Sequence, residues 1–287
     1  MKGNRLWLLY TFITISFWGV WGALIEIPER SGFPTTMGYV VWSCTMIPVA
    51  LFALSRVNWK PEFNKRAIFQ GFAAGLLGCG GQIILFQALR TGPAYLVFPI
   101  VSLYPVLTIV LSLIFLKERA GIIHWIGIIL CLFAMFFLSN PQVSPEKSEG
   151  IGWLVLAFLV FVMWGVQAYV LKFSNKTTKA ESLFFYTTIS SFLFIPFALL
   201  MTDFSIPINL GFKGLWLTAM IQILNAIGAL TLIYALRYGK AIVVAPMTGL
   251  APVITVILSL IIYSVVPGGF LLVGLILASI SIILLST

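Results

Sequence analysis

The chain has 287 residues, of which 61% are hydrophobic and 9% are charged, and its net charge is +9. A soluble domain has roughly 25% charged residues, so this composition excludes a water-soluble fold. The 15% aromatic content excludes a disordered chain, and the sequence lacks the roughly ten-residue alternation of a membrane β-barrel.

Apolar runs of about twenty residues recur along the whole chain, and each can cross a hydrocarbon core about 30 Å thick as a helix. In chain order, the first half holds candidate spans at residues 6–25, 37–54, 67–89, 94–116 and 121–138. The second half holds them at residues 151–171, 182–201, 215–236, 241–264 and 268–285. We therefore predict an all-α membrane protein with ten transmembrane helices and no soluble domain.

The positive charges indicate how these spans are oriented. With the N-terminus in the cytoplasm, 13 of the 17 Lys and Arg residues fall in cytoplasmic loops, and only Arg30, Arg90, Lys147 and Lys213 fall outside. An excess of Lys and Arg in short cytoplasmic loops is typical of membrane proteins. Membrane topology thus accounts for the basic balance, so we predict no nucleic-acid partner. An even number of spans places both termini in the cytoplasm.

The two halves of the chain share an internal repeat. Residues 88–113 align without gaps on residues 235–260 at an offset of 147, and 14 of the 26 positions are identical. The matches include Pro99 with Pro246 and Pro105 with Pro252. Near the start of each half, Trp18 matches Trp164 at an offset of 146. We therefore predict two homologous five-helix repeats, at residues 1–139 and 150–287.

Five spans per repeat make the second repeat cross the membrane in the opposite direction to the first. Inverted repeats that share a midplane cavity are a recurrent architecture of secondary transporters. The paired prolines support this reading, because proline inside a helix frees backbone groups that need partners within the membrane. We predict that Pro99, Pro105, Pro246 and Pro252 break the helices at the transport site. The alternative is that these prolines only bend helices for packing.

The repeated ALR-x-G-x-A…P…P…S-L segment and the Leu-Lys-Glu-Arg sequence at residues 116–119 resemble the EamA family of the drug/metabolite transporter superfamily. The resemblance implies transport of small metabolites, often amino acids or related compounds, across a bacterial cytoplasmic membrane. It also implies a central cavity lined by spans 1, 3, 4, 6, 8 and 9. The family commonly has a glutamate after the fourth span of each repeat. Glu118 supplies it in the first repeat, but Val265 stands at the equivalent position of the second.

No Asp, Glu, Lys or Arg lies well inside a predicted span. A charged group in the midplane is costly and is usually functional, so its absence argues against a strongly charged substrate. We expect a neutral or zwitterionic solute held by hydroxyls, amides, aromatic rings and freed backbone groups. No residue stands out as a carrier for proton or sodium coupling, so facilitated diffusion or exchange is the simpler mechanism.

Polar and aromatic residues within the expected cavity helices are the candidate solute ligands. They are Trp18, Trp21, Gln82, Tyr104, Trp164, Gln167, Asn225, Thr231, Tyr234 and Thr248. Buried amides and hydroxyls in a membrane must find partners, so these residues either bind solute or form hydrogen bonds between helices. Sequence alone leaves both roles open.

We therefore predict a secondary transporter or exporter with no cofactor and no metal. One histidine and one aspartate, Asp203, cannot supply the residues of known intramembrane proteases, so we expect no enzyme. A non-transporting membrane partner, scramblase or sensor with the same fold is the alternative. The sequence indicates no oligomeric state.

Overall fold

The computed structural model describes residues 5–92, 97, 100–138, 151–263 and 268–286. Over these residues the chain is helical and contains no strand. The first half forms α1 (Leu6–Leu24), α2 (Glu26–Arg30), α3 (Thr35–Ser55), α4 (Lys65–Thr91), α6 (Tyr104–Ile114) and α7 (Ile122–Leu138). The second half forms α8 (Gly152–Ser174), α9 (Ala180–Leu193), α10 (Ile195–Leu200), η1 (Phe212–Trp216), α11 (Leu217–Tyr238), α12 (Ala241–Thr248), α13 (Ala251–Tyr263) and α14 (Gly269–Ser286).

Eight stretches of the described chain are long and apolar enough to cross a membrane as helices. The fourth and fifth predicted spans correspond to shorter apolar helices, Ile100–Ile114 and Ile122–Leu138. The fourth is shorter partly because 94–96 and 98–99 of its predicted range lie outside the described residues. The structure thus supports a helical membrane protein, and helix length alone supports eight of the ten predicted spans.

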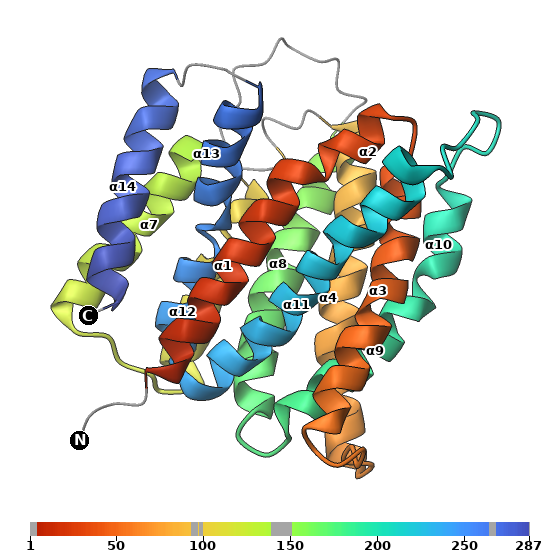
Figure 1. The fold of residues 1–287 in the computed structure, drawn as a ribbon. Coiled ribbons are helices and arrows are strands. Elements are labelled where there is room, and N and C mark those ends of the chain that lie inside the picture. The colour runs from red at the N-terminus through yellow and green to blue at the C-terminus, as the bar shows by residue number, and fades with distance from the viewer. Residues whose placement is uncertain (1–4, 93–96, 98–99, 139–150, 264–267, 287) are drawn as a thin grey trace.

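The equivalent first helices of the two halves, α1 and α8, run in opposite directions (Figure 1). Both meet the C-terminal end of α11, but with different ends. Trp7, at the start of α1, lies against Gly239. Asn175, just after the end of α8, donates a hydrogen bond to the carbonyl of Ile233. Because one helix begins where the other ends, the equivalent elements are inverted.

Each half packs its first helix against the other half. Helix α1 packs on α11 and α13, and α8 packs on the equivalent α4 and α6. The hydrogen bonds repeat as well. The Thr255 hydroxyl donates to the Gly19 carbonyl, and the equivalent Thr108 hydroxyl donates to the Gly165 carbonyl, both at 2.9 Å. The fold is therefore built from two interlocked halves with matching contacts.

Helix breaks fall between the paired prolines. In the second half, α12 ends at Thr248 and α13 begins at Ala251. In the first half, α6 begins at Tyr104 after a turn residue, Leu103. Tyr104 and Ala251 are equivalent at the offset of 147. Proline cannot donate the hydrogen bond that would continue a helix, which explains why both breaks occur at the same repeat position.

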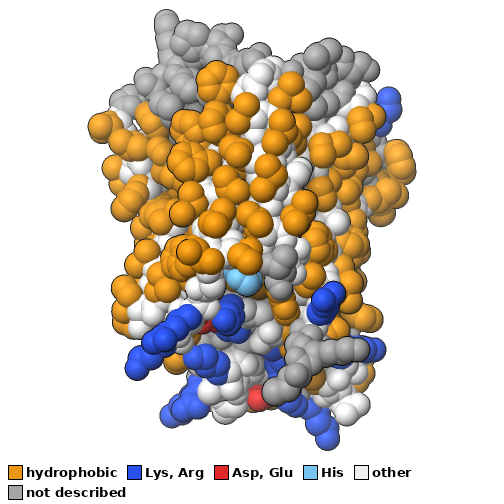
Figure 2. Space-filling model, turned by 90° about the vertical axis from the view of Figure 1, so that its left-hand side faces the viewer, with side chains coloured by type: hydrophobic (Ala, Val, Ile, Leu, Met, Phe, Trp, Pro, Cys, Tyr) orange, Lys and Arg blue, Asp and Glu red, His pale blue; other side chains and the backbone are white. Residues whose placement is uncertain are grey.

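The surface divides into an apolar body and one charged end. Figure 2 shows hydrophobic side chains covering most of the visible face, with most of the visible Lys and Arg at one end. In Figure 1 this is the end where the N-terminus lies, and we call it the basic end. Side chains such as Phe133, Leu200 and Ile276 are exposed on the body. An exposed apolar body of this kind fits a lipid environment.

Candidate substrate cavity

A cavity of about 330 Å³ lies between the two halves. It is bounded by residues of α1, α3, α4, α6, α8, α9, α11, α12 and α13, together with the segment just before α6. Eight of the ten residues proposed as solute ligands line it, namely Trp18, Trp21, Gln82, Tyr104, Trp164, Gln167, Asn225 and Thr248. Its volume is within the range of small-molecule sites.

Thr231 and Tyr234 do not line this cavity. The Thr231 hydroxyl lies 2.8 Å from that of Thr14 and joins α11 to α1. The Tyr234 hydroxyl donates to Glu181 at 2.7 Å. Although Thr231 lies between the cavity residues Ala229 and Leu232, its hydroxyl, like that of Tyr234, bonds to another helix.

The four prolines have different surroundings. Pro252 lines the cavity. Pro105 is buried in the first turn of α6, where a missing N–H costs nothing. Pro246 lies inside α12, and its carbonyl accepts a hydrogen bond from the Cys131 thiol at 3.1 Å. Pro99 lies outside the described residues.

Two equivalent tryptophans line the cavity. The Trp18 indole N–H donates to the Asn225 carbonyl, and the Trp164 indole N–H donates to the equivalent Gly78 carbonyl, both at 3.3 Å. Trp164 also contacts Tyr104 edge to face, with ring centroids 6.1 Å apart. Because their N–H groups bond to helix backbone, these indoles are held in place and present apolar surface to the cavity.

The cavity amides lack protein partners. Within the described residues, the side-chain amides of Gln82, Gln167 and Asn225 make no hydrogen bond, although all three line the cavity. The indole N–H of Trp42 is buried and also has no partner. Unpaired polar groups in a membrane interior are costly, so the three amides that line the cavity are available to a solute or to water.

Several residues that line the cavity were not among the predicted solute ligands. They are Trp42 on α3, Thr187 on α9, and Cys79, Ser102 and Thr255 within the expected cavity helices. The family resemblance omitted the second and seventh spans, which is why Trp42 and Thr187 were not found. For Trp42, a tryptophan in the middle of a predicted span was the one sequence feature that could have indicated a cavity residue.

A second, outer cavity of about 680 Å³ lies at the end opposite the basic end. It shares Trp21, Gln82 and Leu85 with the first cavity, so the two adjoin. Charged residues line this outer part, among them Glu29, Arg90 and Asp203. Hydrogen bonds from the Ser205 hydroxyl and backbone N–H hold the pKa of the Asp203 carboxyl below its ordinary value.

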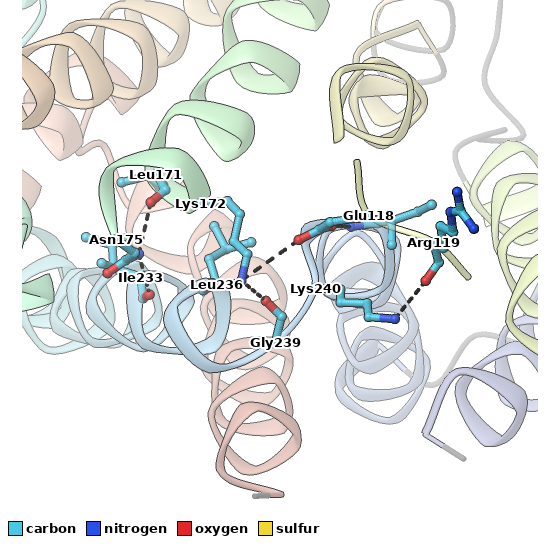
Figure 3. Close-up of polar contacts among 10 residues, drawn as sticks. Glu118, Arg119, Leu171, Lys172, Asn175, Ile233, Leu236, Gly239 and Lys240 are labelled. Carbon is cyan, nitrogen blue, oxygen red and sulfur yellow. Dashed lines mark hydrogen bonds and ion pairs between the residues drawn. The ribbon is translucent and has the colours of Figure 1, made fainter. Parts of the chain in front are cut away.

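The opposite boundary of the first cavity is closed by polar contacts at the basic end (Figure 3). Leu171 and Ile233 line the cavity, and Asn175 donates to both of their carbonyls at 3.0 Å. The neighbouring Lys172 ammonium donates to the carbonyls of Leu236, at 2.9 Å, and Gly239. These contacts fasten the end of α8 to the end of α11.

Glu118 completes this closure from the first half. Its Oε1 lies 3.9 Å from the Lys172 Nζ, and its Oε2 accepts the Ile242 N–H at 3.0 Å. The carboxylate therefore lies at the N-terminus of α12, where the helix dipole favours negative charge. Lys240 adds a hydrogen bond to the Arg119 carbonyl. We call Glu118, Lys172 and Asn175 the basic-end seal.

Aromatic rings also connect α1 with the C-terminal part of α11. Tyr10 of α1 stacks on Tyr234 and Tyr238, with centroids 5.0 Å and 5.9 Å apart. From the sequence, Lys172 is one of the 13 cytoplasmic Lys and Arg residues, and Glu118 belongs to the family motif. Their pairing joins positions 54 residues apart in different halves, so no local pattern could predict it. Val265, the position equivalent to Glu118, lies outside the described residues.

The sequence matches the EamA-like transporter family over residues 5–140 and again over residues 151–287. It is 24% identical over 148 residues to the uncharacterized transporter YxxF of Bacillus subtilis, covering 50% of this chain and 48% of that protein. It is 24% identical over 144 residues to an uncharacterized transporter of Archaeoglobus fulgidus, covering 48% of this chain and 49% of that protein. The chain thus spans about half the length of the curated relatives it matches.

The fold has a counterpart among solved structures. One protein crystal structure superposes with a TM-score of 0.78 over 96% of this chain and 97% of that chain, at 17% sequence identity. At this identity the likeness extends to the fold alone.

Proposed function

Since the chain belongs to the EamA-like transporter family, we propose that it is a secondary transporter of small neutral or zwitterionic metabolites that works by alternating access. The observation that carries the proposal is the cavity between the inverted halves, with unpartnered amides in its wall. Such a cavity at the interface of inverted repeats is where secondary transporters bind substrate.

The asymmetry between the two ends of the cavity supports the alternating-access part of the proposal. One end adjoins the outer cavity through Trp21, Gln82 and Leu85. The other is closed by Lys172 and Glu118, which bridge the halves. Release at the basic end would require these contacts to break while the outer cavity closes. The seal and the outer cavity would thus exchange roles in each cycle.

We further propose that the chain resides in a bacterial cytoplasmic membrane with the basic end and both termini in the cytoplasm. The short helices Ile100–Ile114 and Ile122–Leu138 would complete ten spans, in repeats at residues 1–139 and 150–287. The gathering of Lys and Arg at one end supports this orientation. The solute and the lipid bilayer are the partners that the proposal requires, with no cofactor, metal or nucleic acid.

Flux into proteoliposomes containing the purified protein tests the function. Labelled amino acids, nucleosides and sugars are supplied in turn, and initial uptake is measured against concentration. We expect saturable uptake for one class of solute. Absence of saturable flux for every class would contradict transport and would favour a membrane partner or sensor, and flux of labelled lipid alone would favour a scramblase.

Two cavity substitutions test the site within this assay. Trp164→Ala removes one wall and Asn225→Ala removes one unpartnered amide, so each should change the apparent KM or the flux by about tenfold while expression persists. Gln87→Ala on α4, which lines neither cavity, is the control and should behave as wild type. Unchanged saturation curves for both cavity variants would contradict the site assignment.

A further inference from the structure

The polar pattern of the cavity departs from the symmetry of the fold at one pair of positions. On one side, the Trp21 indole N–H of α1 donates to the Gln222 side chain of α11 at 3.0 Å. In the equivalent pair of helices, Gln167 of α8 occupies the position of Trp21, and Gly75 of α4 occupies the position of Gln222. The amide of Gln167 thus faces no side-chain partner where its counterpart has one.

A second departure makes room beside the same amide. Asn225 of α11 is equivalent to Gly78 of α4, and the Gln167 amide lies against Gly78. The framework around it is kept, because Trp164 bonds to the Gly78 carbonyl as Trp18 bonds to the Asn225 carbonyl. The tryptophan–backbone contacts are thus the same in both repeats, whereas the amides without partners occupy different positions in the two repeats. This separates Gln167 from an amide such as Gln222, which joins helices.

The three free amides reach the cavity from three helices, Gln82 from α4, Gln167 from α8 and Asn225 from α11. Each amide offers both a donor and an acceptor. None of the described residues that line the cavity is charged. Lys172, next to the cavity residue Leu171, is engaged with Leu236, Gly239 and Glu118. An ionic group on the solute would therefore lose its hydration without gaining a counter-charge.

We propose that the cavity selects an uncharged solute with an amide-type group, which Gln167 holds together with Gln82 and Asn225. The apolar part of the solute lies against the indoles of Trp18 and Trp164. An amide on the solute presents a donor and an acceptor side by side, which matches the edge of a glutamine amide. The proposal rests on the proposed function and narrows it, because it excludes zwitterionic amino acids.

Four small aromatic probes of similar shape test this selection in the full-length protein purified in detergent. They are benzamide, which is uncharged, benzoate, benzylammonium and phenylalanine. The melting temperature is measured against probe concentration, since a ligand that binds the folded state raises it. We expect saturable stabilisation by benzamide alone. Equal or greater stabilisation by any of the other three, or none by benzamide, would overturn the proposal.

Substitutions at Gln167 test the residue. Gln167→Leu should weaken benzamide binding about tenfold, because it removes the hydrogen bonds of the amide. Gln167→Glu keeps the shape and adds a negative charge, so it should lose benzamide binding and gain benzylammonium binding. Gln87→Leu, outside both cavities, is the matched control and should bind as wild type. If Gln167→Leu does not fold, the exchange of probe preference in Gln167→Glu decides the question, and its absence would overturn the role of Gln167.

The same probes separate this proposal from transport itself. Saturable benzamide binding without benzamide flux in proteoliposomes would support the amide site and contradict transport. Saturable flux of phenylalanine that benzamide does not inhibit would support transport and overturn the amide site. Saturable benzamide flux that is lost in Gln167→Leu would support both.

Discussion

Lys172→Met is expected to open the cavity at the basic end. The side chains of Lys172 and Glu118 are only 16% and 9% exposed. Removing the ammonium therefore leaves the carboxylate without its counter-charge and two carbonyls without their donor. This loss destabilises the closed arrangement by about 2 kcal/mol, which shifts the equilibrium between closed and open arrangements roughly 30-fold towards the open one. The measurement uses Ala229→Cys, a cavity position, in a background with Cys44, Cys79 and Cys131 replaced by alanine. Its reaction with an impermeant maleimide from the basic end should accelerate by about that factor.

Two further variants sharpen this prediction. Lys176→Met removes an exposed lysine one turn along the chain and should leave the labelling rate unchanged. Adding Glu118→Gln to Lys172→Met removes the buried charge and keeps an acceptor for the Ile242 N–H, so part of the closure should return. Equal labelling of all variants from the basic end would contradict the role of the seal.

Gly19→Ala and Gly165→Ala are expected to destabilise the interface between the halves to a similar degree. A Cβ at Gly19 would lie 2.4 Å from the Ile254 Cβ and 2.9 Å from the Ala251 carbonyl. At Gly165 it would lie 2.7 Å from the Leu107 Cβ and 2.9 Å from the Tyr104 carbonyl. Rigid neighbours of this kind cannot move aside, so each variant should lose about 1–3 kcal/mol and several degrees of melting temperature.

Glycines elsewhere in the fold provide the control for these substitutions. At Gly152 and Gly269, a Cβ would meet nothing within 4 Å. Alanine is a better helix former than glycine, so Gly152→Ala and Gly269→Ala should melt at or slightly above the wild-type temperature. Similar losses at all four positions would show that the effect is general and would contradict close packing of α1 on α13 and of α8 on α6.

The fold was largely predictable because it follows from two strong patterns. Hydrophobic run length located the helices, and the internal repeat matched Trp18 with Trp164. In the structure the two indoles make matching hydrogen bonds to the equivalent carbonyls of Asn225 and Gly78. Helix α7 covers nearly all of the predicted fifth span, 121–138, whereas part of the predicted fourth span lies outside the described residues.

The candidate site was predictable in part. Residues near the middle of the expected cavity helices, such as Gln82 and Asn225, line the cavity. Thr231 and Tyr234 lie nearer the end of α11, and only the rotation and crossing of the helix decides that they contact Thr14 and Glu181 instead. The basic-end seal could not be predicted from the sequence, because the ion pair between Lys172 and Glu118 depends on how the two halves pack together.

The central claim is that two halves of opposite orientation enclose the solute path. Arg30 and Lys176 are equivalent at the offset of 146, and both are exposed. In the background without native cysteines, Arg30→Cys and Lys176→Cys are labelled with an impermeant maleimide in sealed vesicles of known orientation. The account predicts that Arg30→Cys reacts only from the outside and Lys176→Cys only from the cytoplasmic side. Reaction of both positions from the same side would contradict it.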